Sequence, residues 1–335
     1  MPTLGVIETN GHTTSYLEEG PKDGPLIVFV HGWPELSHSW RHQLPAMARL
    51  GFHAVAPDLR GYGGSSKYRD HDAYSQEKVV ADMLGLADGL NAETAVWVGH
   101  DWGSPTVWNI ASHHPDRCRA VASLCVPYAT LEYGVDRVID LVDRSVYPLD
   151  EYPVGQWDYQ LYYQECFEKA QSAMEANVGN TIKALFRCGN PDAVGKPAVT
   201  ASIRSSGGWF GGGGEAPDLP LDAEVISTDD LAVYSQALQA SGFFGANSYY
   251  MNHEANTIYA KTAVDQGRLA MPVLFMAARY DSVCESVDSA LGRPMREQCS
   301  DLTEVTVDSG HWMAQECPQE VNDVLETWIA GEVGV

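Results

Sequence analysis

The sequence has 335 residues, of which 44% are hydrophobic and 20% are charged, and its formal net charge is −24. This composition is that of an ordinary globular protein, and no apolar run approaches the roughly 18 residues of a membrane span. An acidic surface repels nucleic acid and anionic lipid, so neither is expected as a partner, and the charge is interpreted as a solubilising surface.

The amino-terminal stretch and the cysteines indicate the compartment. The first residues, MPTLGVIETNGH, lack the basic start and apolar core of a secretory signal. The seven cysteines are odd in number, widely spaced and free of CxxC pairs, which favours reduced thiols over a disulfide framework or a zinc site. We therefore expect a cytoplasmic protein.

Short β-branched runs alternate with helical patterns in the first 127 residues, which is typical of a mostly parallel sheet. The chain begins with a predicted hairpin around Asn10 and Gly11, because both residues tolerate the positive φ of a tight turn. The predicted strands that follow are 25–32, 53–58, 95–101, 120–127, 272–281 and 302–311. The predicted helices of this pattern are 75–90, 104–114 and 318–330.

Residues 128–262 interrupt that pattern with aromatic-rich helical stretches and no convincing parallel strand. The glycine-rich stretch at 205–214, SSGGWFGGGG, follows no strand and lacks the Lys-Ser/Thr of a phosphate-binding loop, so it is interpreted as a flexible loop. The sequence therefore predicts an α/β core, residues 1–127 and 263–335, and a helical cap, residues 128–262, that packs over one face of the core.

The stretch WVGHDWGS places Asp101 between a predicted strand and a predicted helix, with Gly99 and Gly103 two residues to either side. A sharp turn of this kind needs small neighbours and normally presents a nucleophilic serine. A carboxylate there suits attack on an sp3 carbon that bears a strained or good leaving group, and the product is a covalent alkyl ester that water can open. Ser104 lies outside the centre of the turn and is not expected to act as a nucleophile.

Such chemistry needs an oxyanion hole, a base for water and an acid that orients the base. The backbone N–H of Trp102, which follows the nucleophile, and that of Trp33 in FVHGWPE are the expected oxyanion donors. His311 follows a late strand and is the predicted base, while Asp281, at the end of the preceding strand, is the predicted orienting acid. His31 is interpreted as a structural residue of its turn.

The motifs HGWPE, GHDWG, YD and SGHW occur in this order along essentially the whole chain. Together they resemble the motifs of soluble epoxide hydrolases of the α/β-hydrolase superfamily, and GGWFGG is similar to fungal-type members. The resemblance implies an α/β-hydrolase fold, with a mostly parallel eight-stranded sheet and a helical cap. It also implies that a small apolar epoxide and water are converted to a vicinal diol, with no metal or organic cofactor.

The same resemblance assigns two cap tyrosines as acids for ring opening. WDYQLYYQE maps the first to Tyr159, and FGANSYYMNHEAN selects Tyr250 over its neighbour Tyr249. The chemistry requires such donors because an alkoxide is a poor leaving group unless it is protonated or stabilised. Cap aromatics such as Trp209 suggest an apolar pocket. The residues expected to line the substrate pocket are Trp33, Trp102, Trp157, Tyr249 and Trp312.

Two other functions compete with this hypothesis. A haloalkane dehalogenase shares the aspartate nucleophile, but it holds its halide with N–H donors, typically with Asn where this chain has Trp33, and it lacks the tyrosine pair. A non-catalytic ligand-binding protein on the same scaffold would show a degraded triad, whereas Asp101, Asp281 and His311 are all present. The natural epoxide, the carbon attacked and the oligomeric state, including a homodimer, stay open.

Overall fold

In the computed structural model, which describes residues 2–333, eight strands form a single sheet in the order β1-β2-β4-β3-β5-β6-β7-β8. The first two strands form an antiparallel hairpin, β2 pairs antiparallel with β4, and the remaining neighbours are parallel. The strands are β1 (Thr3–Thr9), β2 (His12–Glu19), β3 (Leu26–Val30), β4 (His53–Pro57), β5 (Ala95–His100), β6 (Cys118–Leu124), β7 (Val273–Ala278) and β8 (Leu302–Val307).

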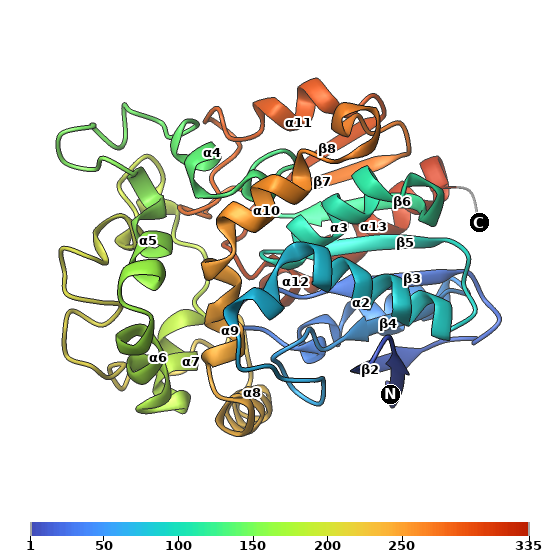
Figure 1. Cartoon of the computed structure of the whole chain (residues 1–335), viewed down its shortest axis with the longest axis horizontal. Helices are drawn as coiled ribbons and strands as arrows, with labels where there is room; N and C mark the ends of the chain where they lie inside the picture. The colour runs from blue at the N-terminus through green and yellow to red at the C-terminus, as the bar shows by residue number, and fades with distance from the viewer. Residues whose placement is uncertain (1, 334–335) are drawn as a thin grey trace.

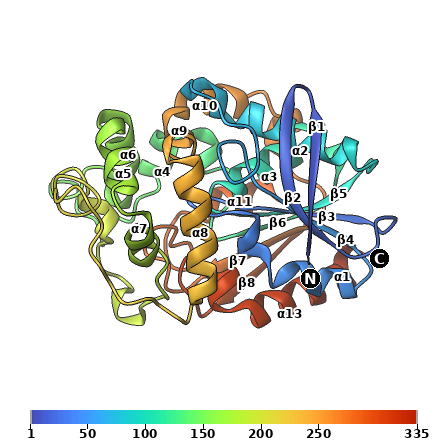
Figure 2. The same ribbon diagram turned by 90° about the horizontal axis from the view of Figure 1, so that it is seen from below.

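Helices cover both faces of this sheet. Figure 2 shows α1 and α13 on one face and α2 and α3 on the other. The helices are α1 (Gln43–Arg49), α2 (Gln76–Gly89), α3 (Gly103–His113), α4 (Val135–Ile139), α5 (Asp158–Glu165), α6 (Phe167–Glu175), α7 (Val178–Leu185), α8 (Thr228–Ser241), α9 (Phe244–Ser248), α10 (His253–Ala260), α11 (Arg293–Gln298), α12 (Met313–Glu316) and α13 (Pro318–Trp328).

The predicted eight-stranded, mostly parallel α/β sheet is confirmed, and each predicted strand overlaps an observed one, although β6 begins two residues before its predicted range. The predicted hairpin is also confirmed, with φ of 55° at Asn10 and 71° at Gly11. The predicted ranges extend past the strands at their carboxyl ends, because they include the turn residues. The residues of β3 and β5 are buried throughout, which explains their continuous apolar runs.

Helices α4 to α10 all lie between β6 and β7, and no strand is described between Cys125 and Pro272. Figure 1 shows α5, α6 and α7 beyond one end of the sheet, whereas α10 returns to the side of α2 and α3. The side chain of Asn256 on α10 accepts a 2.8 Å hydrogen bond from the amide of Gln76 at the start of α2. The division into core and cap at residues 128 and 262 stays a prediction.

Parallel strands bring their carboxyl ends to the same edge of the sheet. The loop that begins at His31 follows β3, Asp101 follows β5, and Cys125 follows β6. Asp281 and His311 come shortly after β7 and β8 at the same edge. The topology therefore gathers the predicted catalytic residues below the helices of the insertion. Within residues 2–333, every helix is too short or too polar to span a bilayer.

Candidate active site

Asp101 occupies the tight turn between β5 and α3, where its φ is 48°. This left-handed conformation is uncommon for a residue other than glycine, although aspartate tolerates it better than most residues. A side chain on Gly99 would come within 2.6 Å of the carbonyl oxygen of Gly103, and one on Gly103 would collide with the carbonyl oxygen of Val30. The spacing of the glycines is therefore what allows the turn to present the carboxylate.

The loop after β3 delivers a donor to this carboxylate. The amide of Trp33 donates a 2.6 Å hydrogen bond to Oδ1 of Asp101, and the Trp33-Pro34 peptide bond is cis. Any side chain on Gly32 would collide with the Asp101 carboxylate. His31 bonds to the carbonyl of Gly32 through Nδ1 and accepts from the amide of Leu59 at Nε2, contacts that suit the structural role expected of it.

His311 stands between two carboxylates. Its Nδ1 donates a 2.6 Å hydrogen bond to Oδ2 of Asp281, and its Nε2 lies 3.5 Å from Oδ2 of Asp101. The other oxygen of Asp281 accepts from the amides of Val283 and Cys284 at 2.9 and 3.0 Å. The structure thus brings the three predicted residues of the triad together.

The charges in this triad reinforce one another. Burial alone would lower the pKa of His311, but the carboxylates of Asp281 and Asp101 outweigh it and hold the pKa well above its ordinary value. Burial would likewise raise the pKa of Asp281, but the charge and hydrogen bond of His311 lower it on balance. The two carboxylates therefore favour the protonated form of His311 in the free enzyme.

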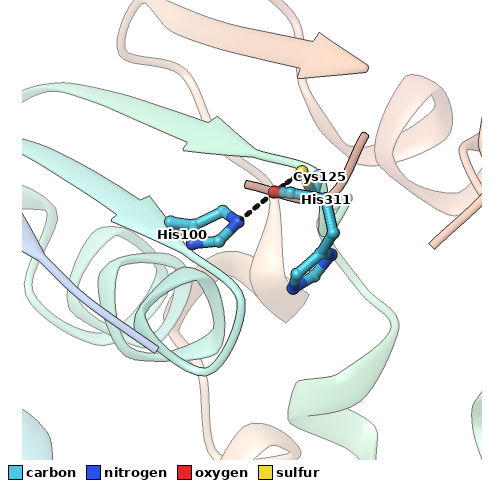
Figure 3. Close-up of side chains that lie close together, drawn as sticks. All are labelled: His100, Cys125 and His311. Carbon is cyan, nitrogen blue, oxygen red and sulfur yellow. Dashed lines mark hydrogen bonds between the residues drawn. The ribbon is translucent and has the colours of Figure 1, made fainter. Parts of the chain in front are cut away.

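A second histidine holds the backbone of the first. Figure 3 shows Nε2 of His100 and the thiol of Cys125 on either side of the carbonyl oxygen of His311. Both donate hydrogen bonds to that oxygen, at 2.7 and 3.3 Å. Nδ1 of His100 bonds to Oε2 of Glu35 at 2.7 Å, and the same oxygen accepts from the amide of Gly32. Glu35 therefore connects the loop that carries Trp33 to the segment that carries His311.

Glu35 and His100 form a fully buried ion pair. Burial opposes charge on both, but each charge overcomes this effect on the other: the pKa of Glu35 falls to about 2, and that of His100 rises to about 10. Sequence reasoning missed this pair. Glu35 is the acidic residue of HGWPE and His100 directly precedes Asp101, but neither motif indicates that the two side chains pair.

Tyr159 and Tyr250 approach the same space from the insertion. Their rings meet edge to face with centroids 5.7 Å apart, and Tyr250 also stacks on Tyr163 at 4.3 Å. Burial, followed by the nearby Cys284 and Asp101, raises the pKa of Tyr159 well above its usual value. Burial, Tyr159 and Asp101 do the same to Tyr250. Both phenols are therefore neutral donors at physiological pH.

A cavity of about 410 Å³ connects these groups. The lining residues from the core edge and the insertion include Asp101, His311, Trp33, Trp312, Tyr159, Tyr250 and Trp209. Trp209 comes from the glycine-rich loop and stacks on Trp33, with centroids 5.6 Å apart.

Three of the residues expected in the pocket are not among those that line this cavity: Trp102, Trp157 and Tyr249. The hydroxyl of Tyr249 instead donates to the carbonyl of Arg60 at 3.1 Å, on the side of the core. Trp157 is fully buried. Trp102 directly follows Asp101 and immediately precedes α3, and the use of its amide as the second oxyanion donor stays a prediction.

The fold and the site define a hydrolase of the α/β type with an aspartate in the turn between β5 and α3. In agreement, the family model described as "alpha/beta hydrolase fold" matches residues 25–316. The chain is 32% identical to "Epoxide hydrolase A" of Mycobacterium tuberculosis, over 98% of both proteins.

Solved structures give the same result. The crystal structure of Epoxide Hydrolase A from Mycobacterium thermoresistibile matches with a TM-score of 0.79 and 32% identity over 99% of each chain. A Vigna radiata epoxide hydrolase mutant matches with a TM-score of 0.77 and 28% identity over 98% of each chain. The chain belongs to the epoxide hydrolases of the α/β-hydrolase fold family. These relatives are bacterial and plant proteins and give no support to the fungal-type assignment.

Proposed function

We propose that this enzyme converts a small apolar epoxide and water to a vicinal diol through a covalent ester on Asp101. The observation that carries the proposal is the position of His311, whose Nε2 is 3.5 Å from Asp101 and whose Nδ1 is 2.6 Å from Asp281, in a cavity that two neutral tyrosines also line. This arrangement supplies a nucleophile, a base and two proton donors without a metal or an organic cofactor.

In the first step, a carboxylate oxygen of Asp101 attacks one ring carbon, and the bond between that carbon and the ring oxygen breaks. The ring oxygen takes a proton from Tyr159 or Tyr250. Burial keeps these phenols protonated until the alkoxide develops, and an alkoxide is a stronger base than a phenolate. The step leaves an alkyl ester on Asp101 and a tyrosinate.

The ester changes the charge balance around His311. In the free enzyme the Asp101 carboxylate is one of the groups that raise the pKa of His311, and esterification removes its charge. The pKa of His311 therefore falls, and its proton can return to the tyrosinate. Neutral His311, oriented by Asp281, then takes a proton from water that attacks the ester carbonyl. The amides of Trp33 and Trp102 hold the oxyanion. Its collapse breaks the bond between the Asp101 acyl carbon and the alkoxide oxygen. The alkoxide takes the proton of the added hydroxyl group and leaves as the diol, so that Asp101 is again a carboxylate and His311 is again protonated.

Two contacts argue against the alternatives. The indole N–H of Trp33 donates a 3.0 Å hydrogen bond to Oδ1 of Asn247, so it is already engaged and does not offer itself to a halide leaving group. The hydrogen bond between His311 and Asp281 is intact, which disfavours a degraded, non-catalytic scaffold. The cytoplasmic location and the homodimer remain predictions.

The covalent route is tested by a single turnover with styrene oxide in heavy-oxygen water. The new diol oxygen should come from Asp101, and the label should stay on the protein; label that enters the diol directly would refute the ester. In His311→Gln the ester should accumulate, because only its hydrolysis needs the base. A parallel assay for halide release from haloalkanes should be negative.

A further inference from the structure

A cysteine lies inside the catalytic centre. Cys284 follows Asp281 by three residues, and its amide donates to Oδ1 of Asp281 at 3.0 Å. Its side chain is buried. Its sulfur, a carboxylate oxygen of Asp281 and a ring nitrogen of His311 all lie within 4.8 Å of one another. The turn after β7 and the loop after β8 therefore place a sulfur, an oxygen and a nitrogen donor around one point.

We propose that Cys284, Asp281 and His311 form a binding site for a zinc-like dication, Zn²⁺ or Cd²⁺, that inhibits the enzyme. Zinc prefers four tetrahedral ligands drawn from sulfur, nitrogen and carboxylate oxygen, with bonds of about 2.0–2.3 Å. A thiolate and a carboxylate together neutralise the charge of the ion, which suits a buried site. Because Asp281 and His311 also line the cavity, water can occupy the fourth position.

Binding of the ion is an exchange of protons for metal, with no change of oxidation state. The ion displaces the proton of the Cys284 thiol and the proton that His311 shares with Asp281, and both protons leave to solvent. Because the ligand atoms lie within 4.8 Å of one another, the sulfur needs to approach the other two by no more than about 1 Å. Nδ1 of His311 and the carboxylate oxygen of Asp281, which are 2.6 Å apart, must separate slightly to reach the spacing of tetrahedral ligands.

The other sulfur beside His311 does not offer an equivalent site. Cys125 and His100 also lie within 4.8 Å of His311, but the Cys125 thiol and Nε2 of His100 both donate to the carbonyl oxygen of His311. Nδ1 of His100 is engaged with Glu35. Both ring nitrogens of His100 are therefore engaged in hydrogen bonds. Cys284, in contrast, adds a sulfur ligand to His311 and Asp281, two side chains that already share one proton.

An ion at this site should stop one half of the reaction and spare the other. A neutral imidazole has a single lone pair for a proton or a metal, so metal-bound His311 cannot accept a proton from water. Asp101 is not a ligand and can still attack the epoxide. The ion should therefore trap the alkyl ester. This kinetic consequence rests on the proposed role of His311, whereas binding of the ion does not.

The site is tested by titrating metal-stripped protein with Cd²⁺ and recording the ultraviolet absorption of a cadmium–thiolate bond. One Cd²⁺ per chain should give the band, and Mg²⁺, which avoids sulfur, should not. Cys284→Ser and Cys284→Ala should lose the band. Half inhibition of each Cys284 variant, measured against the variant's own metal-free rate, should need at least about 10-fold more Cd²⁺. Removal of even an outer partner of a metal weakens metal binding by that factor. The matched variants Cys125→Ser and Cys188→Ser should retain both responses.

The outcomes separate this inference from the proposed function. A band or inhibition that persists in both Cys284 variants, or that is lost in Cys188→Ser, would overturn the site. The Cd²⁺ titration needs no turnover, so it stands even if no epoxide is hydrolysed. With Cd²⁺ bound, mass spectrometry after addition of epoxide should find the ester on Asp101, and EDTA should release the diol. A Cys284-dependent band without a trapped ester would support the site and contradict the role of His311 as the base.

Discussion

The two walls of the active-site cavity handle charge in opposite ways. On the side of the strand ends, charged groups are paired: His311 with Asp281, and His100 with Glu35, at distances of 2.6 and 2.7 Å. On the side of the insertion, Tyr159, Tyr163 and Tyr250 lie against one another, and burial raises the pKa of all three. On the side of the strand ends ions are held in place, and on the side of the insertion these three phenols remain neutral; we call the two groups of residues the charged wall and the neutral wall.

This difference matches the division of labour in epoxide hydrolysis. The nucleophile must be an anion, and the base must exchange a proton, so the base needs charged partners that set its pKa. The acid that assists ring opening must keep its proton until an alkoxide forms, which a buried phenol does without any partner. If the comparison is right, variants on the two walls should affect different half-reactions.

The largest effect is expected from Asp101→Asn. Asparagine has nearly the same shape and tolerates the positive φ of this turn, but it is not a nucleophile. Turnover of styrene oxide should fall by about 10⁴–10⁶-fold, the range expected when a nucleophile is removed. The melting temperature should confirm that the variant is folded. Ser104→Ala, just beyond the turn, is the matched control. A comparable loss of turnover in that variant would indicate that Ser104 takes part in catalysis.

The next largest effect is expected on the neutral wall. The double variant Tyr159→Phe, Tyr250→Phe should slow formation of the Asp101 ester by about 10²–10⁴-fold, the usual contribution of positioned acids. Hydrolysis of an ester that does form should be much less affected, as stopped-flow single turnovers can show. Tyr163→Phe is the matched control, because its buried hydroxyl makes no hydrogen bond. Loss of ring opening in Tyr249→Phe instead of Tyr250→Phe would reverse the choice between the neighbours.

The sequence predicted the positions on the charged wall better than those on the neutral one. Asp101, Asp281 and His311 each follow a strand that is visible as an apolar run, and parallel strands bring such positions together. Tyr249 and Tyr250 lie in one short 3₁₀ helix, where consecutive side chains point about 120° apart, so one faces Arg60 and the other the cavity. Only the fold decides which of the two tyrosines faces the cavity.

The same reasoning explains the residues that the sequence did not place. Glu35 and His100 are 65 residues apart, and nothing in either motif indicates that they pair. Trp157 belongs to an aromatic-rich segment whose pattern does not say which of its rings face the cavity, and it is buried elsewhere. Cys284 has no periodicity or spacing that marks it, and the turn after Asp281 brings it to the site.

Glu35→Gln should produce a smaller effect, and one confined to the charged wall. Glutamine can still accept from the amide of Gly32, but it removes the charge that keeps His100 protonated. We expect a loss of about 2–3 kcal/mol in the free energy of unfolding, the upper range for hydrogen bonds to charged groups. Ester hydrolysis should slow more than ester formation, because His100 holds the backbone of His311. An equal slowing of both steps would contradict this positioning role.

A further effect, on stability, concerns a second buried glutamate at the start of the insertion. Glu132 accepts hydrogen bonds from the amides of Ala129 and Thr130, but burial outweighs these contacts and the distant charge of Arg137, and its pKa rises to about 7. Glu35, which has a histidine partner, has a pKa of about 2. The two glutamates therefore allow a paired and an unpaired buried carboxyl group to be compared in the same chain.

The contributions of Glu35 and Glu132 to the free energy of unfolding should change in opposite directions as the pH rises. Because the folded pKa of Glu35 lies below its unfolded value of about 4.5, its stabilisation is present above pH 4.5 and is lost as the pH falls toward 2. Glu132 has a raised folded pKa, so folding favours its protonated form, and stability is lost as the pH rises from about 4.5 to 7. The pH-dependent contribution of each glutamate to the free energy of unfolding is about 3 kcal/mol at most. Denaturant unfolding across pH 3–8 should therefore show that Glu132→Gln removes a decline toward neutral pH, while Glu35→Gln removes a decline toward acid. Parallel curves for the two variants would mean that the unpaired carboxyl group is not held neutral.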